Sequence, residues 1–497
     1  MRPSIETARL LGIPVRWLVV VAISAVVAWN LSLRWEMLFQ HRTELGGVEH
    51  NVIHGIQKVM LGKALYEDPE RPPFDVIQYT PAYYVLCAAI GKVLGLHGDD
   101  ARAVFVLSRA VALVLWTLMG WFVFRACRAG GASTWSAVLA AGITICSTWE
   151  QAFSRMDALV GATSAATAWL FIRWLTTGSQ RALTATMVVA TIGVFAKQSG
   201  VVMVAAPLLY LAIAREWQQL RKAMVSLLLT TALCSLGMLS LGSITAIHQN
   251  IVLGLRNGFS WMMYTELFNP PTYKYFIGWH VLAVVLAVVG WRARNAPLRF
   301  IAIAVPLSLG FAMATGLKYG SRLNYLHESL MLTFIGTTFL IHDRSASTWG
   351  RTLAWSFVGY GCLFAAFRTN SVAAWYRMGL PDAPHVEQLQ ADMAVRDVLI
   401  NDLGLKPDEL ILITYREYLE HFFVGQSVLT QKDIVQYSTN ALFDYSNLYR
   451  AMSDGTVRFV VTDGSIGPVS LLDSTYSGWY PVREVDGRKI LGRIARP

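Results

Sequence analysis

The sequence predicts a polytopic α-helical membrane protein that ends in a small α/β domain. Three observations lead to this fold class. Hydrophobic residues make up 54% of the 497 residues and charged residues only 15%, with a mean hydropathy of +0.43, whereas soluble domains carry about 25% charged residues. Apolar runs of helical length recur up to residue 367. From residue 368 onward, the composition becomes that of a soluble domain.

The net charge and the cysteines exclude other classes of protein. The 42 Lys and Arg residues exceed the 32 Asp and Glu residues, which gives a net charge of +10, and the basic residues cluster in short loops beside apolar runs. This distribution sets membrane topology and does not indicate nucleic-acid binding. The spacing of the five cysteines supports neither a disulfide framework nor a zinc site. All of them lie in apolar stretches, at Cys87, Cys127, Cys146, Cys234 and Cys362.

About eleven membrane-spanning helices are predicted, since each crossing needs roughly 20 apolar residues. Arg2, Arg9 and Arg16 precede the first apolar run, and no clean cleavage site follows it, so we expect a retained N-terminal anchor. The predicted spans cover residues 15–33, 103–124, 135–148, 158–175, 182–196, 200–214, 223–241, 275–291, 299–316, 326–341 and 353–367.

The basic loops predict the orientation of the chain, because Lys and Arg are enriched in cytoplasmic loops. Alternate loops contain such residues, for example Arg125 with Arg128 and Arg292 with Arg294. We therefore expect a multi-pass protein of the plasma (inner) membrane with a cytoplasmic N-terminus. With an odd number of spans, the polar segment 44–84 and the C-terminal domain lie on the extracytoplasmic side.

Residues 79–96 are apolar enough to cross the bilayer, but a crossing here would move the arginine-rich loops to the outside. We interpret this run as an amphipathic or half-inserted helix at the outer interface, where Tyr79, Tyr83 and Tyr84 suit the headgroup region. Pro81 fits the first turn of such a helix. The first external loop then extends over residues 34–102.

We divide the chain into a transmembrane domain, residues 1–367, and an extracytoplasmic α/β domain, residues 368–497. In the second domain a helical pattern over 385–405 precedes the β-branched run ELILITY. The run VRFVVTDG is typical of another strand, and REVDGRKILGRIA predicts a hairpin at its Asp-Gly pair. The domain has no Walker or Rossmann glycine motif, and a structural or acceptor-docking role is favoured over catalysis.

The first external loop contains four candidate catalytic carboxylates, Glu44, Glu49, Asp68 and Asp75. A carboxylate just outside the bilayer can deprotonate or orient a hydroxyl acceptor. Glu49 is favoured because it follows a Gly-Gly pair and begins the predicted helix EHNVIHGIQKVMLG, whose N-terminus stabilises the ionised side chain. Simple helix capping by Glu49 is the alternative.

His50 and His54 are four residues apart and therefore share one face of this predicted helix. Imidazoles in such an arrangement can ligate a metal ion or contact a phosphate. The alternative is that both are interface histidines without a chemical role.

Asp157 and Lys197 are isolated charges at the predicted outer ends of spans. They are functional candidates, because an unpaired ion near the bilayer is costly. Lys197 could hold the phosphate of a lipid-linked donor and stabilise the charge on the departing phosphate. The alternatives are an ion pair between Asp157 and Arg155 and snorkelling of Lys197. Further candidates near outer span ends are Arg256, Lys318, Arg322, His327 and Glu328.

Together these features resemble the membrane glycosyltransferases of the GT-C fold, especially family 39-like enzymes related to protein O-mannosyltransferases and aminoarabinose transferases. The resemblance rests on an acidic residue at the start of a helix in the first external loop, followed by GKALYEDPERPPFDVIQYTPAYY, RMDAL at a span end and a KQSG turn between spans. It covers residues 15–214 well and the later spans by architecture.

The resemblance implies roles for individual residues. Glu49 matches the family's proposed catalytic base, with Glu44 as the alternative, because Val48 stands where many relatives have Asp. Asp157 matches an acidic position that binds metal or acceptor in some relatives, and Lys197 matches a basic position that faces the donor phosphate. Together with the candidates chosen by their position in the sequence, the predicted substrate-binding residues are His50, Asp157, Lys197, Tyr79, Arg256 and Arg322. A divalent metal, Mg²⁺ or Mn²⁺, is left open, with Glu49 and Asp157 as its ligands.

We therefore predict a glycosyltransferase that uses a polyprenyl-phosphate sugar and acts on the extracytoplasmic face. The expected partners are this donor, a glycan, lipid or protein acceptor, and membrane lipids, but no nucleic acid. One alternative is a lipid or glycan transporter (flippase), although the internal repeats common in transporters are not seen. The other is a non-catalytic scaffold of the cell envelope.

Overall fold

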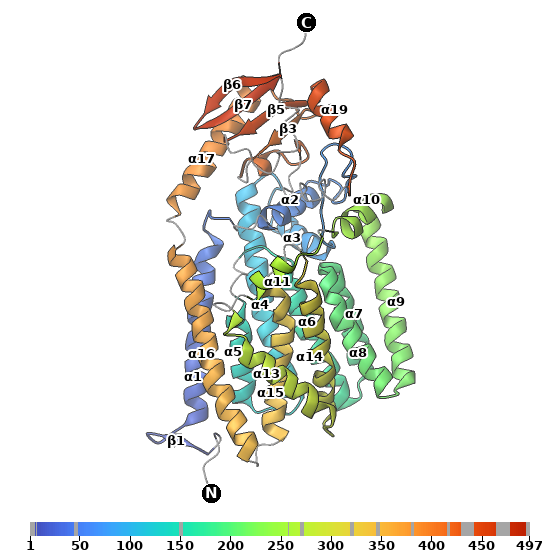
Figure 1. The fold of residues 1–497 in the computed structure, drawn as a ribbon, viewed down its shortest axis with the longest axis vertical. Helices are drawn as coiled ribbons and strands as arrows, with labels where there is room; N and C mark the ends of the chain where they lie inside the picture. The colour runs from blue at the N-terminus through green and yellow to red at the C-terminus, as the bar shows by residue number, and fades with distance from the viewer. Residues whose placement is uncertain are drawn as a thin grey trace.

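The structure is a computed structural model. Its long helices run roughly parallel in one layer; the small sheet domain lies at one end of this layer, and α1 (Val15–Leu38) begins at the other (Figure 1). The described parts of the chain are residues 5, 7–43, 48–148, 153–256, 258–268, 273–318, 323–343, 348–378, 382–414, 418–428, 442–463 and 478–493.

Each predicted membrane span coincides with a helix. By length and composition, five of the described helices, α1, α4, α6, α9 and α14, are long and apolar enough to cross a membrane, and the others are shorter or less apolar. The predicted fold class is therefore confirmed. The helices are α1 (Val15–Leu38), α4 (Ala101–Ala129), α5 (Thr134–Ser147), α6 (Asp157–Thr177), α7 (Gln180–Ala196), α8 (Val201–Ile213), α9 (Trp217–Leu239), α13 (Ile277–Trp291), α14 (Ala296–Thr315), α15 (His327–Asp343) and α16 (Thr348–Met378).

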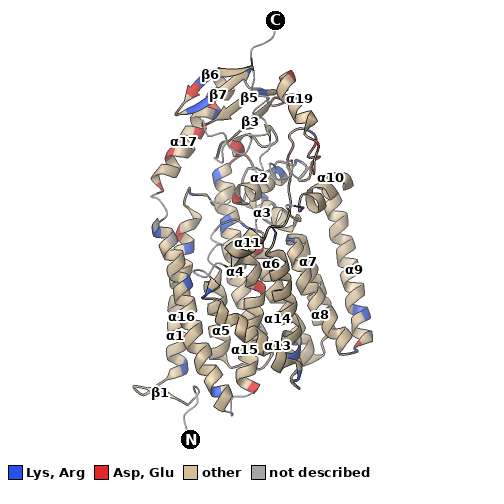
Figure 2. Cartoon of the chain, viewed as in Figure 1, with Lys and Arg blue, Asp and Glu red and all other residues tan. Residues whose placement is uncertain are grey.

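The outer helices of this layer expose large apolar side chains. In α9 only Ala223 is buried, while Leu233 is 70% exposed. Val288 of α13 is 62% exposed. A continuous apolar surface of this kind would be unstable in water, so these faces suit contact with lipid. Charged residues lie mainly at the helix ends and in the sheet domain (Figure 2).

The inner helices pack closely through small residues. A Cβ atom on Gly161 of α6 would lie 2.7 Å from the Trp116 ring and 2.9 Å from the Met119 sulfur of α4. Small residues at such contacts let membrane helices approach one another. The close approach of α4 and α6 brings the beginning of α6 against the buried centre of the layer.

The predicted first external loop, residues 34–102, contains two helices, α2 (Val48–Met60) and α3 (Ala82–Val93). The 12 residues of α3 extend about 18 Å at 1.5 Å per residue, which is less than the roughly 30 Å hydrocarbon core. A helix therefore exists within the predicted run 79–96, but α5 with 14 residues and α8 with 13 are similarly short, so the interfacial position of α3 stays a prediction. The helix α3 packs against α2, α4 and α7.

Short elements complete the helical part. They are β1 (Arg9–Leu10), β2 (Ile13–Pro14), η2 (Gln198–Gly200), α10 (Ile244–His248), η3 (Gln249–Leu253), α11 (Trp261–Leu267) and η4 (Leu323–Leu326). The turn at η2 joins α7 to α8 and contains the KQSG motif, while η4 leads directly into α15.

The C-terminal domain is a mixed five-stranded sheet with the strand order β4-β3-β5-β7-β6. The strands β3, β4 and β5 are parallel, and β7 is antiparallel to β5 and β6. Asp486 and Gly487 both have positive φ at the predicted hairpin, as a two-residue type I′ turn requires. The elements are α17 (Ala383–Asp397), η5 (Val398–Asp402), β3 (Leu410–Ile413), η6 (Tyr418–Phe422), β4 (Ser427–Val428), α19 (Ser446–Asp454), β5 (Val457–Thr462), β6 (Trp479–Val485) and β7 (Arg488–Arg493).

Candidate functional site

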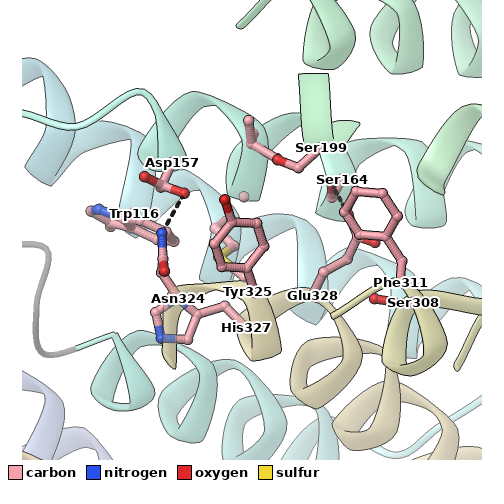
Figure 3. A pocket seen from close by; sticks show the side chains of 13 residues that line it. Trp116, Asp157, Ser164, Ser199, Ser308, Phe311, Asn324, Tyr325, His327 and Glu328 are labelled. Atoms are coloured by element: carbon pink, nitrogen blue, oxygen red, sulfur yellow. Dashed lines mark hydrogen bonds between the residues drawn. The ribbon is translucent and has the colours of Figure 1, made fainter. Parts of the chain in front are cut away.

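A cavity of about 40 Å³ lies among α4, α6, α14 and α15. Asp157, Asn324 and Glu328 provide polar groups, and the Trp116 and Tyr325 rings provide apolar walls (Figure 3). Glu328 accepts a hydrogen bond from the Ser164 hydroxyl at 2.7 Å. Converging polar groups and aromatic walls are features of ligand sites, but those sites usually enclose about 300–1,000 Å³. This cavity has room for a water-sized group only.

Asp157 is the first residue of α6, and its carboxylate faces this cavity. The Lys197 ammonium donates to its Oδ1 atom at 2.8 Å, and the Asn324 side-chain amide donates to the same oxygen at 2.9 Å. The two charged side chains are 13% and 7% exposed. Sequence analysis placed both residues at a site, and the structure brings them into direct contact.

Lys197 lies in the extended connection between α7 and η2. Its Nζ atom is 5.4 Å from the centre of the Tyr79 ring and 5.0 Å from that of Tyr325, distances at which aromatic faces stabilise a cation. Burial by itself lowers the pKa of Lys197, but the Asp157 carboxylate and the two tyrosines outweigh it and raise the pKa. Lys197 therefore remains a cation.

A second lysine lies near this centre. Lys318 follows α14, and its strand-like contact with Phe259 ties it to the segment after η3. Burial, together with the positive charge of Lys197, lowers the pKa of Lys318 to about 8. The two ammonium groups therefore repel one another, and an anion bound near both would relieve this repulsion.

Glu49 occupies a separate, closed position at the start of α2. Arg109 of α4 donates from Nε to Oε1 at 2.7 Å and from its terminal nitrogen to Oε2 at 2.9 Å, and both side chains are fully buried. The backbone N–H of Ser154 also donates to Glu49 at 3.0 Å. Glu49 thus holds the segment that leads into Asp157, three residues further along the chain.

Asp75 and Asp68, two of the other candidate acids in this loop, have structural partners. Asp75 is buried and lies 2.9 Å from Nε2 of His54 and 3.4 Å from the Lys58 ammonium. Asp68 accepts a hydrogen bond from the Gln249 amide at 3.2 Å. These contacts fasten the irregular part of the loop to α2 and to η3.

The remaining predicted site residues lie elsewhere. His50 faces the C-terminal domain, where its Nδ1 atom is 2.8 Å from Nε2 of His421. Arg256 is exposed after η3 and does not line the cavity. Glu44 and Arg322 lie outside the described residues. Apart from Arg256, the described members of the predicted set therefore lie in two regions, one around Asp157 and the other on α2 near the C-terminal domain.

Sequence analysis did not identify Arg109, Asn324 or Tyr325. Arg109 carries a usable signal, since a basic residue within the apolar run of α4 is costly without a partner. Asn324 and Tyr325 carry no comparable signal. Both residue types are common at the ends of membrane helices, and only the packing of η4 brings them to α6.

Glu49 and Asp157 were also the predicted ligands for Mg²⁺ or Mn²⁺. In the structure each carboxylate accepts hydrogen bonds from a cationic side chain, Arg109 or Lys197, and such cations oppose the binding of a divalent ion. Among the described residues, neither carboxylate belongs to a group of three potential metal ligands. The metal at these two residues stays a prediction.

Comparisons with known proteins identify the fold. ArnT from Cupriavidus metallidurans matches with a TM-score of 0.58 at 13% identity, over 96% of this chain and 98% of that one. The oligosaccharyltransferase AglB from Archaeoglobus fulgidus, solved with an inhibitory peptide and a dolichol-phosphate, matches with a TM-score of 0.55 at 10% identity, over 90% of this chain and 69% of that one.

Sequence comparison adds less detail. The family described as a predicted membrane protein (DUF2142) matches residues 61–266, which is less than half of the chain. No curated protein matches the sequence. At 10–13% identity the structural likeness concerns the fold, and this chain has the GT-C fold of membrane glycosyltransferases.

Proposed function

We propose that the protein is a glycosyltransferase that moves a sugar from a polyprenyl-phosphate carrier to an acceptor on the extracytoplasmic face of the membrane. The likeness to ArnT over nearly the whole chain supports the class of enzyme, and the dolichol-phosphate in the AglB structure supports the class of donor. The observation that carries the proposal is the Asp157–Lys197 pair beside a cavity at the end of α6.

In this proposal Lys197 and Lys318 bind the donor phosphate. Transfer breaks the bond between the sugar C1 atom and the phosphate oxygen, and the lipid phosphate leaves with additional negative charge. Two ammonium groups held in place stabilise that charge more strongly in the transition state than in the bound donor. Tyr79 holds Lys197 in position, and Arg256 and Arg322 remain further candidates for phosphate binding.

Asp157 is the proposed general base. When the donor phosphate becomes the partner of Lys197, the Asp157 carboxylate can accept the proton of the acceptor hydroxyl as the new bond to C1 forms. Asn324 keeps the carboxylate oriented through its amide hydrogen bond. Glu49, the base predicted from the sequence, is fully buried against Arg109, and we assign it a positioning role through Ser154.

The experiment is sugar transfer by the full-length protein in proteoliposomes that contain a radiolabelled polyprenyl-phosphate sugar and candidate acceptors. We expect Asp157→Asn to lower kcat by about 10²–10⁴-fold, the usual effect of losing a general base. Glu216→Gln, which alters an exposed carboxylate before α9, serves as the matched control and should keep the wild-type rate.

Glu49→Gln separates the two candidate bases. If Glu49→Gln loses less kcat than Asp157→Asn does and has a lower Tm than the wild type, Glu49 has a positioning role. If instead Asp157→Asn folds and keeps the wild-type rate, Glu49 is the base. Release of free lipid phosphate accompanies transfer. Movement of intact lipid-linked sugar across the bilayer without this release would contradict the proposal and support a flippase.

A further inference from the structure

A second cluster of chemically active side chains lies where α2 meets the C-terminal domain. His50 comes from α2, and Glu420 and His421 come from η6. All three side chains are buried, and one ligand atom from each lies within 4.8 Å of the others. The cluster thus joins the first external loop to a part of the chain about 370 residues later.

The separations of the ligand atoms resemble those of a metal site. Nδ1 of His50 lies 2.8 Å from Nε2 of His421. Oε1 of Glu420 lies 3.5 Å from the first nitrogen and 3.8 Å from the second. Ligands around tetrahedral zinc, at bond lengths of 2.0–2.1 Å, are about 3.3 Å apart. If the two imidazole nitrogens moved apart by about half an ångström, the ion could replace the proton that now lies between them.

Gln57 determines which nitrogen of His421 carries a proton. Its amide nitrogen donates to the carbonyl oxygens of Gly98 at 2.8 Å and of His421 at 3.0 Å. The amide oxygen is therefore the atom that lies 2.9 Å from Nδ1 of His421, and an amide oxygen only accepts. In the neutral ring Nδ1 thus carries the proton, and the lone pair of Nε2 points toward His50 and Glu420.

This arrangement is usual for histidine ligands of zinc, which donate their second N–H to a neighbouring acceptor. The surroundings also favour a single geometry. The two imidazoles are nearly parallel, with ring centres 5.1 Å apart, and Phe105 packs edge-on against both. The donor set is two imidazoles and one carboxylate, which suits Zn²⁺ better than Mg²⁺ or Ca²⁺.

We propose that His50, Glu420 and His421 bind one divalent transition-metal ion, Zn²⁺ by the chemistry of the donors. The ion fastens the C-terminal domain to α2, and a water molecule takes the fourth position. Its binding stabilises the folded protein, because the ligands come from two segments that only folding brings together. This site is separate from the Asp157 cavity and does not depend on the proposed sugar transfer.

Zinc binding tests the proposal directly. The full-length protein, purified in detergent with an affinity tag that lacks histidine, is stripped with a chelator and titrated with ZnCl₂ or CoCl₂. We expect one tightly bound ion per chain and, with Co²⁺, the visible absorption of a four-coordinate site. His421→Ala and His50→Ala, on different elements, and Glu420→Gln should each weaken binding at least tenfold.

Two further variants sharpen the result. Gln57→Met removes the acceptor for His421 and should weaken zinc binding about 10–100-fold, as loss of an outer-shell partner usually does. His248→Ala removes an exposed histidine of α10 and should bind zinc as the wild type does. Chelation should lower the Tm of the wild type and of His248→Ala, but not that of His421→Ala.

The proposal is overturned if the stripped wild-type protein binds no Zn²⁺. It is also overturned if the His421→Ala, His50→Ala and Glu420→Gln proteins all bind Zn²⁺ as the wild type does. In either case the cluster is a hydrogen-bonded histidine pair beside a carboxylate. Because no sugar donor is present, failure here leaves the proposed glycosyl transfer untouched, and failure of the transfer assay leaves zinc binding untouched.

Discussion

Asp157 and Lys197 depend on one another, because each is nearly buried and each would be costly alone. Their 2.8 Å contact compensates for charge that has left water. In the proposed mechanism, the donor phosphate takes the place of Asp157 as the partner of Lys197, and the displaced carboxylate is then available to an acceptor. A pair that exchanges partners in this way links donor binding to activation of the acceptor.

Lys318 gives the proposed phosphate site a pH dependence. Its pKa is lowered to about 8 by burial and by Lys197, so the free enzyme loses this positive charge as the pH rises through that value. We expect kcat/KM for the lipid-linked donor to fall above pH 8. A charge-assisted hydrogen bond contributes about 1.5–3 kcal/mol, so the total loss should be about tenfold or more.

Lys318→Arg is the control for this pH profile, because the arginine side chain stays charged up to about pH 12. In this variant the decrease above pH 8 should disappear, while the activity at pH 7 stays near that of the wild type. An unchanged profile would show that Lys318 does not contact the donor phosphate.

The predictability of the site also differs from residue to residue. Lys197 and Asp157 were accessible to sequence analysis because a charge beside an apolar run is rare and costly. The pairing of Glu49 with Arg109 was not accessible, since Arg109 is 60 positions away on a different helix. Pairing across helices depends on their rotation and depth, which local sequence does not specify.

At the scale of elements, the tight connection between α7 and α8 positions Lys197. Its backbone N–H donates to the Gly193 carbonyl at 3.1 Å, and its own carbonyl accepts from Gly200 N–H at 2.9 Å. A Cβ atom on Gly200 would lie 2.4 Å from the Gly193 carbonyl carbon. The KQSG motif therefore reflects a steric requirement of the turn as well as the need for a lysine.

Gly200→Ala should disturb this turn, because the obstructing atoms belong to the backbone and cannot rotate away. Overpacking of this kind costs about 1–3 kcal/mol, so we expect a lower Tm in detergent and a higher KM for the donor. Gly237→Ala in α9 is the matched control, since nothing lies within 4 Å of its added Cβ. If Gly200→Ala and Gly237→Ala both have the wild-type Tm, the turn does not require glycine at position 200.

At the scale of the whole molecule, the helical layer and the C-terminal domain enclose the first external loop between them (Figure 1). α2 contacts α4 on one side and η6 on the other. Glu49 and His50 are consecutive residues of α2, so the Glu49–Arg109 pair and the His50 cluster both lie where α2 meets its neighbours. One short helix thereby connects the Asp157 segment to the C-terminal domain.

The predicted orientation can be tested by labelling with a membrane-impermeant maleimide. Ser453→Cys places a thiol on an exposed position of α19, and Thr177→Cys places one at the opposite, exposed end of α6. We expect Ser453→Cys to react in cells with an intact plasma membrane and Thr177→Cys to react only after lysis. The wild-type chain, whose five cysteines are free, measures the background. Labelling of Thr177→Cys in intact cells and of Ser453→Cys only after lysis would show that the predicted orientation is wrong.

The sequence by itself determined the membrane-embedded helical class, the position of each apolar helix and the Asp-Gly hairpin of the C-terminal domain. These properties depend on local hydrophobicity, loop charge and turn chemistry, which neighbouring residues specify. The tertiary structure alone decided that Glu49 meets Arg109 and that His50 meets Glu420 and His421. Such contacts join segments 60 and about 370 residues apart, and they follow from helix packing that no local pattern encodes.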